Sequence, residues 1–89
     1  MDRIFTVLIE GNFFYDGDEK VECSPIERNW IDSYWTDEDE AIKEADRLWS
    51  KSEEGQYDRI IVFERKLNLK GQGANLWNGN NDRFVKSWH

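Results

Sequence analysis

The segment RIFTVLIE, residues 3–10, decides the fold class, because apolar side chains occupy both faces of the extended chain that it predicts. Phe5, Val7 and Ile9 alternate with residues that are themselves mostly apolar. A strand with two apolar faces usually lies in the middle of a sheet, covered on both sides or nearly so. We therefore predict that this segment is a central strand, with the other elements arranged around it.

Further strands are predicted on the C-terminal side of this segment. Asp16-Gly17 is typical of a tight hairpin turn between two of them. In NWIDSYW, residues 29–35, simple alternation would place Trp30 and Tyr34 on the same face. Residues Phe13–Tyr15 continue the first strand or begin a second one after a bulge at Gly11. The further strands that we predict are Lys20–Cys23, Asn29–Trp35, Asp58–Leu67 and Arg83–Trp88.

An amphipathic helix is predicted from about Asp37 to Ser50, because apolar side chains recur there at spacings of three and four. Thr36 is the expected N-cap, and acidic residues in the first turn complement the helix dipole. One helix cannot cover both faces of a sheet, so the other face should be open and partly aromatic. The predicted fold is α+β: a small, mostly antiparallel sheet of about five strands, in the order β-β-β-α-β-β, with the helix packed on one face.

The bulk properties of the chain indicate a single domain, residues 1–89. Its only cysteine, Cys23, excludes an internal disulfide framework and favours a reducing compartment. No stretch approaches the roughly 20 apolar residues of a membrane span, and no secretory cleavage site follows the N-terminus. We therefore expect a cytoplasmic protein with no membrane anchor.

Charge is distributed unevenly along the chain, whose formal net charge is −7. Residues 1–58 hold seventeen of the nineteen acids but six of the twelve bases. Carboxylates spaced along a helix and a hairpin can imitate the phosphates of a nucleic acid. The predicted partner is therefore a basic nucleic-acid-binding protein. The simpler alternative is that the acidic surface only maintains solubility. The residues predicted to make the contact are Asp37, Glu38, Asp39, Glu40 and Glu44 for charge, and Trp30, Tyr34 and Trp77 as anchors.

Residues with the chemistry for catalysis or metal binding are few. The only histidine is His89, and with the lone Cys23 it excludes a metal site built from several such ligands. Residues 16–27 lack the glycine of a calcium loop, and residues 71–73 lack the third glycine of a dinucleotide-binding turn. Asp32, among aromatic residues, could serve as a general acid, but an exposed edge position is the simpler explanation. We predict a protein that is not an enzyme and has no catalytic, cofactor-binding or metal-binding residue.

The C-terminal third supports an alternative function, because bases and aromatic residues are interleaved in residues 59–89. That pattern is typical of a small module that binds a nucleotide or a single-stranded nucleic acid by stacking and phosphate contacts. The negative charge of the whole chain opposes this alternative. An open aromatic sheet face would also favour a homodimer.

Two segments resemble a pattern that is common in small phage and prophage proteins. Residues 35–42, WTDEDEAI, would lead from a strand into a capped helix, and residues 59–65, RIIVFER, would return as a hydrophobic strand. In overall character the chain is also similar to phage anti-defence proteins, including anti-CRISPR proteins, which are often small, acidic and non-enzymatic. The resemblance implies an inhibitor that binds tightly to a nucleic-acid-handling enzyme, and it assigns no functional residue in this chain.

Overall fold

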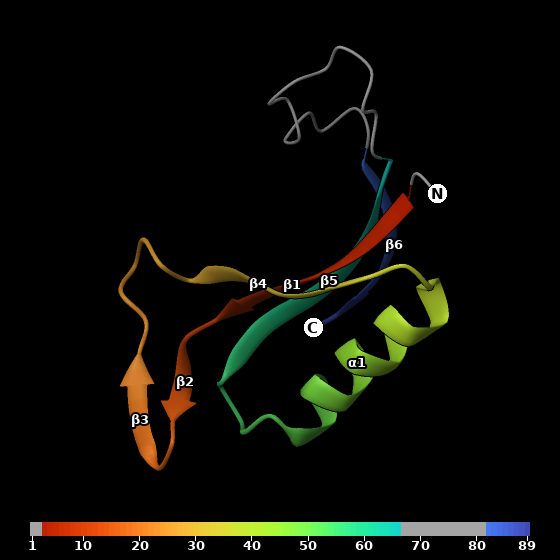
Figure 1. Cartoon of the computed structure of the whole chain (residues 1–89). Coiled ribbons are helices and arrows are strands. Elements are labelled where there is room, and N and C mark those ends of the chain that lie inside the picture. The colour runs from red at the N-terminus through yellow and green to blue at the C-terminus, as the bar shows by residue number, and fades with distance from the viewer. Residues whose placement is uncertain (1–2, 67–81) are drawn as a thin grey trace.

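The computed structural model describes residues 3–66 and 82–89 (Figure 1). The chain begins with four strands: β1 (Arg3–Gly11), β2 (Phe13–Asp16), β3 (Glu19–Glu22) and β4 (Asn29–Trp35). It continues with the helix α1 (Glu38–Lys51) and with the strands β5 (Tyr57–Lys66) and β6 (Asp82–Trp88). The predicted strands and helix are all present within these residues, and the α+β class is confirmed.

Strand β1 lies in the interior of the sheet, as its two apolar faces predict. The four-stranded sheet has the order β4-β1-β5-β6, and each neighbouring pair is antiparallel. Strands β2 and β3 form a separate hairpin that projects from the end of β1 (Figure 1). The hairpin therefore stands apart from the sheet, on the same side of it as α1.

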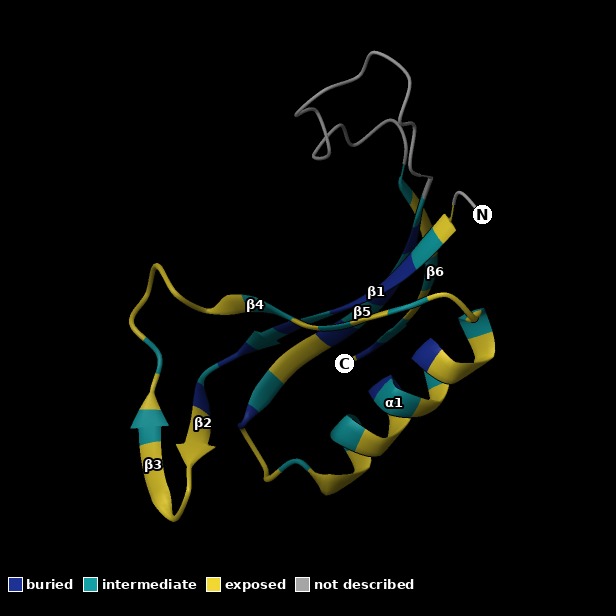
Figure 2. Ribbon diagram, in the orientation of Figure 1, coloured by how far each residue is buried: buried dark blue, intermediate teal, exposed yellow. Residues whose placement is uncertain are grey.

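The hydrophobic core lies between α1 and one face of the sheet (Figure 2). The two alanines on the inner side of the helix have short side chains, so the helix backbone can approach the strands closely. Each buried valine or isoleucine contributes roughly 1.5–3 kcal/mol to folding, relative to an exposed position. The most deeply buried members of this core are Val7, Ile9, Ile60, Val62, Ala41 and Ala45.

Large aromatic side chains extend the core beyond the width of the helix. Trp30, Trp35 and Trp49 pack against the core while remaining partly exposed, and Trp88 is buried. A four-stranded sheet is about 19 Å wide and a helix about 10 Å, so bulky rings are needed at the margins. The indole of Trp88 also donates a hydrogen bond from Nε1 to Asp46 Oδ1 at 3.3 Å, which links β6 to α1.

The opposite face of the sheet, here called the open face, is not covered by any element within the described residues (Figure 1). Tyr34 on β4 and Phe84 on β6 are 62% and 63% exposed. Both side chains belong to this face by their register with β1 and β5. The structure thus has the partly aromatic open face that a single helix leads us to expect.

The N-terminus of α1 differs from the prediction by one residue. Asp37, rather than Thr36, is the N-cap, because its Oδ1 accepts a hydrogen bond from the Asp39 N–H at 2.8 Å. Asp37 has the extended backbone of an N-cap, and both residue types are good caps. The sequence alone therefore did not distinguish the two positions.

A register shift in β4 overturns the prediction that Trp30 and Tyr34 share a face. Asp32 is the extra residue of this β-bulge, and it interrupts the alternation of side chains. Trp30 pairs with Ile9, on the helix side of the sheet, whereas Tyr34 pairs with Thr6, on the open face. The two predicted anchors consequently point to opposite sides of the sheet.

Candidate protein-binding surface

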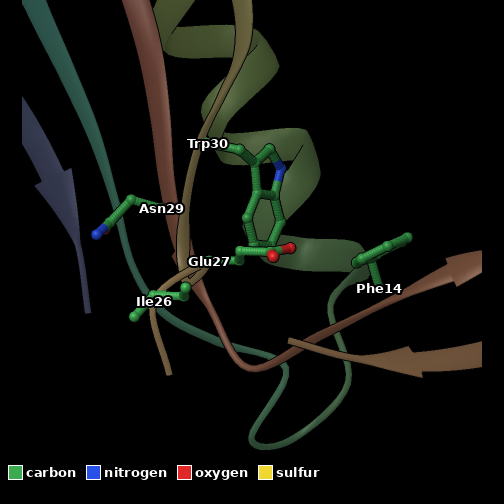
Figure 3. Close-up of a pocket in the computed structure, with 5 residues that line it drawn as sticks. All are labelled: Phe14, Ile26, Glu27, Asn29 and Trp30. Carbon is green, nitrogen blue, oxygen red and sulfur yellow. The ribbon is translucent and has the colours of Figure 1, made fainter. Parts of the chain in front are cut away.

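A cleft of about 550 Å³ opens between the β2–β3 hairpin and the start of β4 (Figure 3). It is an open surface feature, since Ile26 on its rim is 91% exposed and Phe14 is 42% exposed. Most of its lining is apolar or aromatic, with one carboxylate and one amide. The residues that line it are Phe14, Ile26, Glu27, Asn29 and Trp30.

The position of Trp30 in this cleft depends on the absence of a side chain at Gly11. A Cβ atom at Gly11 would lie 2.7 Å from Trp30 Cη2, a distance that real Cβ contacts essentially never show. The indole is also held from two sides by edge-on packing, with ring-centroid distances of 6.2 Å to Phe14 and 6.3 Å to Tyr57. Such aromatic pairs are favourable beyond the area they bury, so Trp30 forms a fixed wall of the cleft.

The base of the hairpin is held in place by Asn12. Its Nδ2 donates to the Gly55 carbonyl oxygen and to Asp58 Oδ1, both at 3.0 Å. Its Oδ1 accepts a hydrogen bond from Arg28 Nη2 at 2.6 Å. Asn12 therefore ties the hairpin to the connection that follows α1, and the cleft is formed before any ligand arrives, which lowers the entropy cost of binding.

Two exposed acids stand on the cleft side of the hairpin, and we call them the hairpin acids: Asp16 and Glu19. They are direct cross-strand partners and lie on the same hairpin face as Phe14. Like charges directly opposite each other destabilise a strand pair, and a basic partner would relieve that repulsion. On the other hairpin face, the Tyr15 hydroxyl donates to the Glu53 carboxylate, and this hydrogen bond raises the pKa of Tyr15.

Three of the five helix acids that the sequence predicted as contact residues have structural roles within the chain. Asp37 caps the helix. Glu38 accepts a hydrogen bond from Arg83 Nη2 at 3.0 Å. Glu44 accepts two hydrogen bonds from the Arg47 guanidinium, at 2.8 Å and 2.6 Å, and these bonds are the main cause of its lowered pKa.

The other two helix acids, Asp39 and Glu40, are exposed in the first turn of α1, and no ion pair holds either of them within the part of the chain that the structure describes. This end of the helix is remote from the hairpin (Figure 1). The predicted charge on α1 and the cleft are therefore two separate features of the surface.

The three predicted anchors are not brought together. Trp30 lines the cleft, Tyr34 lies on the open face, and Trp77 lies outside the described residues. The other four cleft residues were not predicted: Phe14, Ile26, Glu27 and Asn29. The sequence does carry a weak sign of Ile26, because it is an isolated apolar residue in the polar segment between β3 and β4.

Within the described residues, acids and metal-ligating side chains do not gather at the cleft. Glu27 is the single carboxylate among the cleft residues, so two acids do not converge there. Asp32 accepts a hydrogen bond from Ser33 Oγ at 2.8 Å and lies outside the cleft. Within the same part of the chain no cluster of three metal-ligating side chains occurs, and no helix has the length and apolar character needed to span a membrane.

The described arginines of the C-terminal third are engaged in ion pairs within the chain. Arg59 pairs with Glu10 on β1. Arg65 donates to Asp82 at 2.8 Å and 3.0 Å, and Arg83 donates from Nε to Glu64 at 2.9 Å. These cations serve cross-strand contacts, and the described structure gives no separate support for phosphate binding.

No family model matches this chain, and comparisons with curated proteins and with solved structures find no significant similarity.

Proposed function

We propose that the chain is a non-catalytic binding protein whose partner is a basic nucleic-acid-binding protein. The cleft would receive a side chain of that partner, and the hairpin acids would take the place of nucleic-acid phosphates. The observation that carries the proposal is the placement of an exposed aromatic side chain, Phe14, on the same face of the hairpin as an acidic cross-strand pair. An inhibitor of the phage anti-defence type is the form of function that we propose.

The chemistry of the cleft favours a long cationic side chain as its occupant. The faces of Trp30 and Phe14 attract a cation, and Glu27 offers a carboxylate for its charged end. The aliphatic part of a lysine or arginine would pack against Ile26. Residues that dominate binding energy are often aromatic and lie in well-packed pockets, and Trp30 in the preformed cleft has this character.

The remaining negative charge would act over a longer range. A net charge of −7 attracts a basic partner and speeds its association, and this effect weakens as salt increases. Asp39 and Glu40 would contribute mainly in this way, since they are remote from the cleft (Figure 1). We therefore expect the hairpin acids to control dissociation and the helix acids to control the association rate.

The test begins with capture of partners from a lysate of the source cells, followed by competition with duplex DNA and with RNA. Asp16→Lys/Glu19→Lys should reduce retention of the captured protein by about tenfold or more, and Ile26→Ser should do the same without a change of charge. Asp39→Lys/Glu40→Lys is the matched control, because it changes the charge by the same amount in the first turn of α1, remote from the cleft. Equal losses of retention for the two charge variants, or no competition by nucleic acid, would contradict the proposed mode of binding.

A direct titration separates this function from the nucleic-acid-binding alternative. Single-stranded oligonucleotide should leave the tryptophan fluorescence unchanged even at low salt, where phosphate contacts are strongest. Quenching that saturates and disappears with added salt would instead favour the basic C-terminal third as the functional region.

A further inference from the structure

The open face contains two complete rows of side chains that cross all four strands. The first is an aromatic row in which Tyr34, Thr6, Phe63 and Phe84 are consecutive cross-strand partners. Thr6 is 2% exposed, so its neighbours close over it. The second row is aliphatic for three of its four positions: Ile31, Leu8, Ile61 and Ser87.

Ion pairs bound these two rows at both ends. Arg65 and Asp82 pair at one end, with nitrogen–oxygen distances of 2.8 Å and 3.0 Å, and Arg59 pairs with Glu10 at the other. The described charges of the open face therefore balance, although the whole chain carries −7. Among the described residues, the excess negative charge lies on the other side of the sheet, on α1, the hairpin and the connections between them.

We infer that the open face binds a second copy of this chain, forming a symmetric dimer in which two sheets pack face to face. A two-fold axis parallel to the strands would lay each row over its own copy. Tyr34 would then meet Phe84 of the second copy, and Arg59 would meet Glu10 of the second copy, each contact occurring twice. The sheets would lie about 10 Å apart in an aligned sandwich.

Charge favours this occupant, and the area of the face limits its affinity. Two copies that approach by their open faces keep their acidic helices on the outside, which minimises repulsion between them. A basic partner, in contrast, finds no excess negative charge on this face. The two complete rows with their flanking ion pairs cover a flat area of about 400 Å² per copy, so the dimer belongs among small, weakly associating interfaces.

The inference is independent of the proposed function, because the cleft and the hairpin acids remain outside the dimer interface. Sedimentation velocity from about 1 µM to about 500 µM should show a reversible monomer–dimer equilibrium. Phe84→Lys should raise the dissociation constant by about tenfold or more, and Tyr34→Lys should repeat the effect. Ile26→Lys is the matched control, since it introduces the same charge at an exposed apolar residue and should leave the equilibrium unchanged.

Disulfide cross-linking tests the orientation of the two copies. In a Cys23→Ser background, a mixture of the Tyr34→Cys and Phe84→Cys chains should form mixed disulfide dimers faster than either chain does alone. Circular dichroism would establish that each variant is folded. A monomer at every concentration, an equal effect of Ile26→Lys, or cross-links formed only between identical variants would overturn the inference.

Discussion

Replacement of Gly11 by alanine should destabilise the fold and disturb the cleft at the same time. The new Cβ would lie 2.7 Å from Trp30 Cη2, 3.1 Å from Tyr57 Cδ1 and 3.2 Å from the Gln56 carbonyl oxygen. Carbon atoms normally approach to about 3.5–4.0 Å, so the indole has to move by about 1 Å. The nearby Gln56 carbonyl oxygen limits how far the Cβ can shift.

The expected magnitude follows from two opposing effects. Overpacking of this kind costs about 1–3 kcal/mol. Alanine in place of a strand glycine recovers about 0.5–1 kcal/mol of conformational entropy. The net loss of unfolding free energy should therefore be about 1–2 kcal/mol, which corresponds to a fall in Tm of about 5–15 °C for a chain of this size.

Thermal denaturation followed by circular dichroism would measure the loss of stability, and tryptophan emission would report the displacement of Trp30. Gly17→Ala is the control. Gly17 has a φ of +65°, so alanine there is also destabilising, but nothing lies within 4 Å of its Cβ position. This substitution should therefore lower stability without changing the tryptophan emission. Trp30→Phe removes Cη2, so the double variant should recover part of the loss. A stabilising Gly11→Ala substitution, or an unchanged cost in the Trp30→Phe background, would refute the steric argument.

Two further predictions concern the helix. Asp37→Ala should lower the free energy of unfolding by about 1 kcal/mol in chemical denaturation, whereas Thr36→Ala should have little effect, because only Asp37 accepts the Asp39 N–H. The interaction with Arg47 lowers the pKa of Glu44 below its ordinary value of 4.5. The stabilisation of the fold by this ion pair is therefore fully present above pH 4.5, and it is lost as the pH falls through the lowered pKa of the folded state. Glu44→Gln should therefore be destabilising by less than about 1 kcal/mol at neutral pH and nearly neutral in strong acid, as measured by urea denaturation at both pH values.

The elements that sequence predicted well are those that local patterns determine. The two apolar faces of β1 required an interior position, and α1 followed from its apolar spacing. The bulge at Asp32 could not be predicted in this way, because it arises from the pairing of β4 with β1. One extra residue then reversed the side of Trp30 relative to Tyr34, which separated two anchors that alternation had placed together.

The cleft was missed for a related reason. Its residues come from β2, from the segment after β3 and from β4, and their proximity depends on the direction in which the hairpin leaves the sheet. That direction is fixed by Asn12 through contacts with residues more than forty positions away, at Gly55 and Asp58. No local pattern carries this information. The acids on α1 were visible in the sequence, but their use in capping and internal ion pairs was not.

The small size of the chain connects its two exposed surfaces. A helix of 14 residues is about 21 Å long and about 10 Å wide, so it covers only part of one face of a four-stranded sheet. Tryptophan side chains fill the margin on the helix side, and Trp30 at that margin becomes a wall of the cleft. On the other side the described residues leave an aromatic row exposed, at a cost in solubility that a binding partner would remove. A domain with so little covering structure leaves apolar surface available for association, and we propose that its charge distribution directs unlike and like partners to different faces.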